Sequence, residues 1–315
     1  MSSKSLPSFL VLLLLASCAQ TPLEVRMLRS GEGALASNGP PAKGVPAKTV
    51  VPEEELDSVE PAPAAAESVA AAMEVDPKIF GGYHALVIGI DNYDHLSNLG
   101  SAKRDALSVK AMLETKYGFK VQLLLDATRE EILRGLGDMR RVLTEDDNLL
   151  IYYAGHGWVD EAENQGYWLP RDAESGSSTY YISNTTVTDK VRSMLAKHVL
   201  VVADSCYSGK ALRGLKIQRR TPGYYEKMAR KKARLIMTSG GVEPVMDAGG
   251  VDGHSVFASA FLRTLRENDA MFDASLLFTD VRQRVVSNSD QTPEYAPIHK
   301  SGDDGGEFIF LPRGR

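Results

Sequence analysis

The chain has 315 residues, a length that allows one large domain or two average ones. Its formal net charge is −5, and its 43% hydrophobic and 24% charged residues are ordinary values for a soluble globular protein. The acidic balance argues against nucleic acid as the main partner, because nucleic-acid-binding domains present a basic face. No apolar run reaches the roughly 20 residues of a membrane-spanning helix, and two cysteines exclude both a disulfide framework and a zinc cluster built from cysteines.

Residues 1–17 have the features of a signal peptide. A short positive start precedes an apolar core, residues 9–15, that is too short to span a bilayer. The segment ends Leu15-Ala16-Ser17-Cys18, which resembles the lipobox of bacterial lipoproteins, where the cysteine thiol is diacylated. The resemblance implies a lipid bilayer anchor at Cys18 in the bacterial cell envelope, and Ala19 favours the outer membrane, facing the periplasm. The alternative is an ordinary signal peptide cleaved near Ala19.

Residues 18–80 are expected to form a lipidated, disordered linker. No Phe, Trp or Tyr occurs from Leu10 to Ile79, and nine of the 15 prolines lie within the first 80 residues. Such a composition cannot bury enough apolar surface to offset the entropy lost on ordering. The globular domain is therefore expected over residues 81–315.

In the globular part, short apolar runs alternate with amphipathic stretches. The apolar runs predict strands at residues 84–90, 119–125, 148–153, 199–203, 234–237 and 308–311. The amphipathic spacing predicts helices between Ser101 and Gly118, after the capping box Thr128/Glu131, around 189–197, and at 255–267 and 278–286. Alternating strands and helices indicate an α/β protein, a three-layer α/β/α sandwich with a mostly parallel central sheet. Ligands of such sheets bind at the carboxyl ends of the strands.

Two of the predicted strand ends carry reactive side chains. The third strand is followed by Gly155-His156-Gly157, and the fourth by Asp204-Ser205-Cys206. Cys206 needs a base, because a free thiol with a pKa of about 8.5 is mostly protonated at neutral pH. His156 is the candidate that accepts this proton and returns it to the leaving amine. The main-chain N–H groups of Gly157 and Cys206 are the natural pair for an oxyanion hole.

Gly155-His156-Gly157, followed 50 residues after the histidine by the run from Asp204 to Gly209 (DSCYSG), resembles the caspase-like cysteine peptidases, and among them the metacaspases and bacterial orthocaspase-like proteins. The interval agrees with the roughly 50 residues between His and Cys in caspases. Asp-Ser-Cys replaces the Gln-Ala-Cys of true caspases, as in metacaspase-type members. Further similarity at residues 85–93, 166–172 and 253–257 extends the resemblance over about 83–310. It implies a caspase-like fold and a catalytic dyad of His156 and Cys206.

The resemblance also implies a pocket for the substrate side chain that precedes the scissile bond. In true caspases this pocket is basic and selects Asp. Here the matching positions are acidic: Asp204, two residues before the nucleophile, and Asp91, at the end of the first strand. Two carboxylates favour Arg or Lys through charge-assisted hydrogen bonds, which resembles metacaspase specificity. The expected substrate is a peptide or protein cleaved after a basic residue.

Several alternatives remain open at this point. A cysteine at a strand end is often a small buried hydrophobe, and Asp204 and Asp91 have alternative roles as a main-chain hydrogen-bond acceptor and a turn residue. His254 is a competing base that opens a predicted helix. The second function class is a catalytically silent caspase-like scaffold that binds envelope partners, and a third is another hydrolase or transferase with the same dyad.

The segment 210–234 contains ten Lys or Arg residues and one acidic residue. It is interpreted either as a solvated surface loop or as an exposed processing loop, with sites such as Arg219, Arg220 and Arg230. No cofactor and no metal site are expected. Some metacaspases need calcium, but acidic residues such as Asp172, Asp303 and Asp304 do not have the spacing of an EF-hand loop, so calcium dependence stays open.

Overall fold

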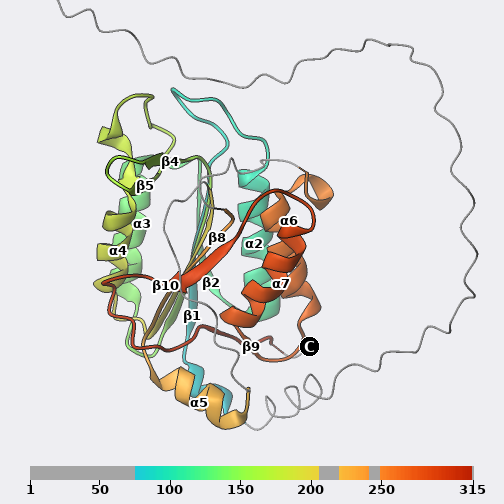
Figure 1. The fold of residues 1–315 in the computed structure, drawn as a ribbon. Coiled ribbons are helices and arrows are strands. Elements are labelled where there is room, and N and C mark those ends of the chain that lie inside the picture. The colour runs from blue at the N-terminus through green and yellow to red at the C-terminus, as the bar shows by residue number, and fades with distance from the viewer. Residues whose placement is uncertain (1–74, 206–219, 241–248, 314–315) are drawn as a thin grey trace, which may run out of the picture. The chain divides into compact units, whose positions relative to one another are not determined.

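The computed structural model describes residues 75–205, 220–240 and 249–313 (Figure 1). Within these ranges the central sheet has six strands in the order β10-β8-β7-β3-β1-β2. Neighbouring strands are parallel except β10, which is antiparallel to β8. The strands in sheet order are β10 (Glu294–Pro297), β8 (Ala233–Thr238), β7 (His198–Asp204), β3 (Asn148–Ala154), β1 (Tyr83–Gly89) and β2 (Lys120–Leu125).

Helices cover both faces of this sheet (Figure 1). One face carries α2 (Ala102–Tyr117), α6 (Val256–Glu267) and α7 (Ala274–Val286), and the other carries α3 (Arg129–Val142) and α4 (Asn184–Arg192). Successive side chains of a strand point to opposite faces. Ala85 and Val87 therefore pack into the core under α2 and α6, while Leu86 and Ile88 pack into the core under α3 and α4. The predicted three-layer sandwich is confirmed.

The ends of α2 and α3 follow the predicted capping signals. Gly118 closes α2 in the left-handed region with φ of 67°, where glycine is favoured. Thr128 and Glu131 form the expected capping box of α3. Gly89 lets α2 approach β1 closely, because a Cβ atom there would lie 2.6 Å from the carbonyl oxygen of Ala102. This close approach brings the N-terminal end of α2 to the carboxyl edge of the sheet.

Three predicted elements differ from the structure in their position or partner. Helix α4 begins at Asn184, five residues before the predicted start, because Ser183 caps it despite its polar first turn. Helix α7 begins at Ala274, where Asp273 caps it. The predicted last strand is β11 (Ile309–Phe310), which pairs with β9 (Phe272–Asp273) in a separate two-stranded sheet.

Other elements were not predicted. A three-stranded antiparallel sheet, order β4-β5-β6, follows β3 in the chain. The remaining elements are β4 (Gly157–Asp160), β5 (Gln165–Trp168), β6 (Ile182–Ser183), α5 (Pro222–Arg230), and the 3-10 helices η1 (Pro77–Phe80), η2 (Ser178–Tyr180) and η3 (Val251–Gly253). Most are four residues or fewer, which is too short for a periodic pattern.

The interpretation of 210–234 as a loop is wrong for its second half, which contains α5 and the start of β8, although Arg230 at the end of α5 is exposed. The Arg220 side chain is 14% exposed and pairs with the fully buried Asp273, with 2.9 Å between Nε and Oδ2. Arg234 is 2% exposed. Residues 206–219 lie outside the described ranges, so cleavage at Arg219 or an earlier residue stays a prediction.

The predicted signal peptide, Cys18 and most of the linker also lie outside the described residues. The packed domain begins earlier than residue 81, since Val75 and Phe80 are buried in a cluster with Tyr225 of α5. Among the helices of the described part, none combines the length and the apolar character that crossing a membrane requires.

Candidate active site

The two strands that lead to the predicted catalytic residues are neighbours. In the parallel pair β3–β7, Ala154 lies opposite Asp204, and the Gly155 N–H donates to the Asp204 carbonyl at 3.4 Å. The segments that follow, one with His156 and one leading to Cys206, therefore leave adjacent strands at the same edge. The description of the second segment ends at the buried Ser205, and Cys206 itself lies outside the described residues.

The His156 imidazole is partly exposed, and the loop after β1 holds it. Its Nε2 atom lies 2.9 Å from the carbonyl oxygen of Ser97, and its ring centroid lies 4.7 Å from that of Tyr93. Because a carbonyl oxygen only accepts, we assign the proton of the neutral ring to Nε2. The lone pair is then on Nδ1, which is the ring nitrogen that is able to accept a proton.

Asp126, which follows β2, anchors the loop that carries Tyr93 and Ser97. Its carboxylate accepts the main-chain N–H groups of Asp91 and Asn92 at 2.9 and 3.0 Å, and it pairs with Lys103 Nζ at 2.7 Å. Partial burial acts to raise the pKa of Asp126, but the hydrogen bonds from Asn92, Lys103 and Asp91 lower it to about 2. The anchor is therefore ionised at any physiological pH.

Asp91 has the position of a capping and turn residue. Its Oδ1 accepts the N–H of Lys103 in the first turn of α2 at 3.1 Å, and its carbonyl accepts the N–H of Leu99 at 2.9 Å. This is the alternative role that the sequence offered for it. A place for Asp91 in the substrate pocket stays a prediction.

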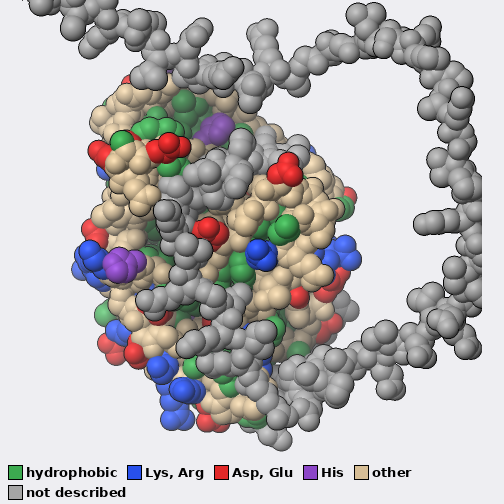
Figure 2. Space-filling view, viewed as in Figure 1, with side chains coloured by type: hydrophobic (Ala, Val, Ile, Leu, Met, Phe, Trp, Pro, Cys, Tyr) green, Lys and Arg blue, Asp and Glu red, His purple; other side chains and the backbone are tan. Residues whose placement is uncertain are grey.

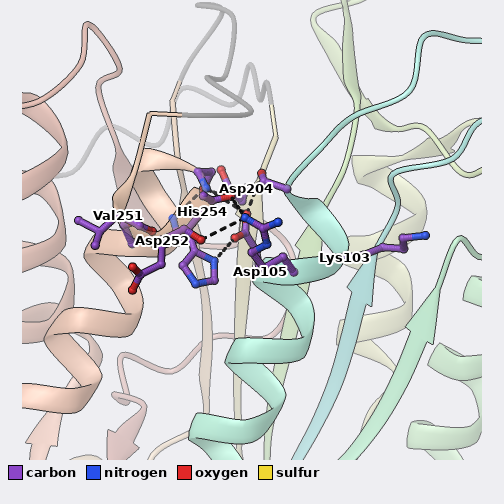
Figure 3. A network of polar contacts seen from close by, with 12 residues as sticks. Lys103, Asp105, Asp204, Val251, Asp252 and His254 are labelled. Atoms are coloured by element: carbon purple, nitrogen blue, oxygen red, sulfur yellow. Dashed lines mark hydrogen bonds and ion pairs between the residues drawn. The ribbon is translucent and has the colours of Figure 1, made fainter.

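Asp204 belongs to a buried polar network (Figure 3). It is 4% exposed, and its Oδ2 accepts the Ser255 hydroxyl at 2.5 Å. Asp105 of α2, 1% exposed, accepts from His254 Nδ1 at 2.5 Å, from the Ser255 N–H at 3.3 Å and from the Ser101 hydroxyl at 3.1 Å. In Figure 3, His254 and Asp105 point toward each other, whereas Lys103 points away from the network. Ser255 thus connects two buried carboxylates from distant parts of the chain.

Burial and the two carboxylates of this network shift the pKa values of neighbouring groups. Burial raises the pKa of Asp105, against the opposing effect of the hydrogen bonds from His254 and Ser255. Burial, with the carboxylates of Asp204 and Asp105, also raises the pKa of Tyr152 well above its ordinary value. A cation that reached these two carboxylates would be stabilised by both.

The family is decided by comparison with known proteins. A family model described as Caspase domain (Peptidase_C14) matches residues 83–301, which includes His156, Asp204 and Cys206. The chain belongs to the caspase domain family. The matched residues cover the central sheet from β1 to β10, which agrees with the resemblance found in the sequence.

Curated relatives of this caspase domain are metacaspases of fungi. Metacaspase-1 of Eremothecium gossypii is 25% identical over 149 residues, which is 42% of this chain and 33% of that protein. Metacaspase-1A of Neurospora crassa is 30% identical over 42% of this chain and 33% of its own length. Metacaspase-1B of Aspergillus fumigatus is 23% identical over 73% of this chain and 60% of its own length. The chain thus matches between a third and three fifths of these relatives.

Solved structures support the caspase-like fold. A Geobacter sulfurreducens protein superposes with a TM-score of 0.51 at 19% identity, over 72% of this chain and 99% of that chain. Caspase-1 from Spodoptera frugiperda superposes with a TM-score of 0.50 at 18% identity, over 69% of this chain and 88% of its own. At this identity the likeness concerns the fold alone, and the fold of the chain is caspase-like.

Three residues of the polar network in this caspase domain, Asp105, His254 and Ser255, are not predicted as binding or catalytic residues by the sequence pattern. The sequence pattern assigns no site role to Asp105 or Ser255, and it offers His254 only as a competing base, whereas the structure pairs His254 with Asp105. Asp105 is separated from His254 by 149 residues, and no local pattern predicts such a contact. The only local signal was the serine that caps α6, since Ser255 accepts the N–H of Ala258.

Two of the three acidic residues named for calcium, Asp172 and Asp303, make other side-chain contacts. Asp172 accepts the N–H of Arg129 at 2.8 Å, and Asp303 accepts the N–H of Arg234 at 2.8 Å. In the parts of the chain that the structure describes, no three His, Cys, Asp or Glu side chains are grouped as metal ligands. Acidic and basic side chains are also interspersed over the face seen in Figure 2.

Proposed function

We propose that the chain is a cysteine endopeptidase with a dyad of His156 and Cys206. The observation that carries the proposal is the β3–β7 pairing, which brings the segment with His156 beside the segment that leads to Cys206. Membership of the caspase domain family and the similarity to metacaspases support it.

In this mechanism the Cys206 thiol transfers its proton to Nδ1 of His156, and the sulfur attacks the substrate carbonyl carbon. The main-chain N–H groups of Gly157 and Cys206 stabilise the oxyanion that forms. His156 then protonates the leaving amine, the peptide bond breaks, and an acyl-enzyme remains on Cys206. Water, deprotonated by His156, hydrolyses the thioester and restores the thiol.

The proposed substrate carries Arg or Lys before the cleaved bond. Asp204 precedes Cys206 by two residues, and its carboxylate is connected to that of Asp105 through Ser255. A guanidinium or ammonium group beside these carboxylates would form charge-assisted hydrogen bonds. Asp105 is a stronger candidate for the second acidic residue than Asp91, because it shares a hydrogen-bonding partner with Asp204.

The test is hydrolysis of reporter peptides by the purified full chain, with Cys206→Ala as the matched control. We expect turnover of Arg- and Lys-terminated reporters, weak turnover of Asp-terminated reporters, and none by the variant. Equal turnover by Cys206→Ala would overturn the mechanism, and a preference for Asp would overturn only the specificity. A wild-type chain that neither cleaves nor reacts with a thiol alkylator at neutral pH would favour the scaffold function.

Anchoring in the bacterial envelope is a separate part of the proposal. It rests on the sequence Leu15-Ala16-Ser17-Cys18, which resembles a lipobox. Expression in a bacterium with a labelled fatty acid would label the wild-type chain and Cys206→Ala but not Cys18→Ala. Label retained by Cys18→Ala would contradict the proposed acylation site.

A further inference from the structure

Two tyrosine hydroxyls hold the main chain of His156 from both sides. The His156 N–H donates to the Tyr93 hydroxyl at 2.7 Å, and the Tyr153 hydroxyl donates to the His156 carbonyl at 2.7 Å. Tyr93 comes from the loop after β1, and Tyr153 lies near the end of β3. Their side chains are 7% and 0% exposed, so water competes little for these hydrogen bonds.

The two hydroxyls are also hydrogen-bonded to each other. Each carries one hydrogen, and the Tyr153 oxygen also accepts the N–H of Leu169 at 3.2 Å. The Tyr153 hydroxyl has one hydrogen and two carbonyl acceptors, His156 at 2.7 Å and Leu169 at 3.1 Å. We assign this hydrogen to the shorter contact with His156, which leaves Tyr93 to donate to Tyr153. With this assignment, the hydrogen bonds form a closed ring that begins and ends on His156.

Gly155 provides an independent measure of how tightly this ring surrounds the turn. A Cβ atom at Gly155 would lie 2.8 Å from the hydroxyl oxygens of both Tyr93 and Tyr153. A side chain at this position would collide with both hydroxyls, so glycine directly before His156 lets them lie this close to the turn.

Tyr93 contacts the side chain of His156 as well as its main chain. The two rings lie 4.7 Å apart at an interplanar angle of 45°. Burial raises the pKa of the Tyr93 hydroxyl, so it stays protonated and able to complete the ring at physiological pH. One residue thus restrains both the turn that carries the imidazole and one face of the imidazole.

We infer that Tyr93, acting together with Tyr153, is a positioning residue for His156. The inference rests on the proposed function only in that His156 is the general base there. The two hydroxyls fix the main chain of the turn, and the Tyr93 ring and the Ser97 carbonyl fix the imidazole, so that Nδ1 keeps one direction. Catalytic proton transfer depends on such alignment, and a misplacement of about 1 Å costs on the order of 100-fold in rate.

The first experiment compares Tyr93→Phe with a matched control, Tyr117→Phe. The control also removes a buried hydroxyl that donates to a carbonyl, that of Leu265 at 2.7 Å, but on α2. We expect Tyr93→Phe to lower kcat by about 10- to 100-fold with KM changed less than about twofold. Tyr117→Phe keeps the wild-type kcat. Equal kcat values for Tyr93→Phe and the wild type would overturn the inference.

Coupling between the two tyrosines tests the ring itself. Tyr153→Phe opens the same ring, so the double variant loses little more kcat than either single variant. Independent, multiplying losses would show that the two hydroxyls do not act together, and would overturn the ring.

A readout independent of activity separates this inference from the proposed peptidase. In full-length Cys206→Ala labelled with ¹⁵N-histidine, the His156 signals, assigned with His156→Gln, report the imidazole tautomer by NMR. We expect a single Nε2-protonated form, which Tyr93→Phe converts to a mixture and Tyr117→Phe leaves unchanged. If this holds while the wild type shows no peptidase activity, the positioning stands and the proposed function fails. If the wild type is active and the spectrum is unchanged by Tyr93→Phe, the positioning fails alone.

Discussion

Ser255 donates its hydroxyl hydrogen to Asp204, and the two oxygen atoms lie 2.5 Å apart although the residues are separated by 51 positions. The same hydroxyl oxygen accepts the N–H of Ala258 at 2.8 Å and so caps α6. One side chain therefore stabilises the start of a helix and orients a buried carboxylate beside the end of β7.

Ser255→Ala should destabilise the fold by about 2–4 kcal/mol. About 1 kcal/mol comes from loss of the helix cap and the rest from loss of a donor to the buried Asp204 carboxylate. Urea unfolding followed by circular dichroism measures this difference. Ser259→Ala, which removes a less buried hydroxyl at 3.3 Å from the Val251 carbonyl, should cost about 0.5 kcal/mol or less. Equal losses in the two variants would contradict the double role of Ser255.

Asp204→Asn should lower kcat/KM for Arg and Lys reporters by about 100-fold, because the substrate cation loses a poorly solvated anionic partner. The amide oxygen can still accept from Ser255, so the fold should be retained. The comparison of Asp105→Asn with Asp91→Asn discriminates between the two candidates for the second acidic residue. We expect the larger loss for Asp105→Asn, and a larger loss for Asp91→Asn would restore the assignment made from the sequence.

Glu307 should make stability depend on pH. Burial and the Asp273 carboxylate raise the pKa of Glu307 to about 8, against hydrogen bonds from Tyr295 and from the Phe308 N–H. The folded state therefore holds a proton that the unfolded state releases at about pH 4.5. This contribution to stability is complete below about pH 4.5 and is lost as the pH rises through about 8, by at most about 1.4 kcal/mol per pH unit.

Glu307→Gln should remove this dependence. Urea midpoints measured from pH 5 to 8.5 should fall less with pH in the variant than in the wild type. The exposed Glu145→Gln serves as the control and should follow the wild-type curve. Parallel curves for wild type and Glu307→Gln would show that Glu307 is not the group responsible.

Arg220→Ala should destabilise the fold by about 3 kcal/mol, because it leaves the fully buried Asp273 carboxylate without its cation. Arg220 also donates to the Ser275 hydroxyl at 2.8 Å, and this hydroxyl in turn donates to the Asp273 carboxylate. The matched control is Arg230→Ala, which removes an exposed arginine that lies 3.9 Å from Glu226. This variant should lower the free energy of unfolding by about 0.5 kcal/mol or less. Chemical unfolding of both variants decides between a structural anchor and an ordinary surface arginine.

The sequence predicted those elements that have a strong local signal. Strands β3 and β7 have apolar interiors and are buried along their whole length, and α3 begins with a capping box, so both kinds of element were expected near their observed positions. The sequence pattern did not decide whether β3 and β7 are neighbours. The structure pairs them, which brings the segment with His156 beside the segment that leads to Cys206.

The place of Asp105 in the network with Asp204 could not be predicted in the same way. Asp105 lies on an amphipathic helix with an ordinary pattern, and its partner Ser255 is 150 residues away. The resemblance to the family matches Asp91 to a pocket position, but a residue at a strand end is equally expected in a turn, and the structure shows Asp91 at the N-terminal end of α2. What distinguishes Asp105 from Asp91 is its hydrogen bonds to His254 and Ser255, which are far away in the sequence. No local sequence pattern predicts such contacts.

Strand β7 and the Arg220–Asp273 ion pair hold the chain on both sides of residues 206–219. Beyond Arg220, the chain continues through α5 into β8, which is paired with β7 along six residues. A single peptide bond broken between residues 206 and 219 would therefore leave two polypeptides that share one sheet. Such a nicked molecule would run as two bands under denaturing conditions and as one particle under native conditions.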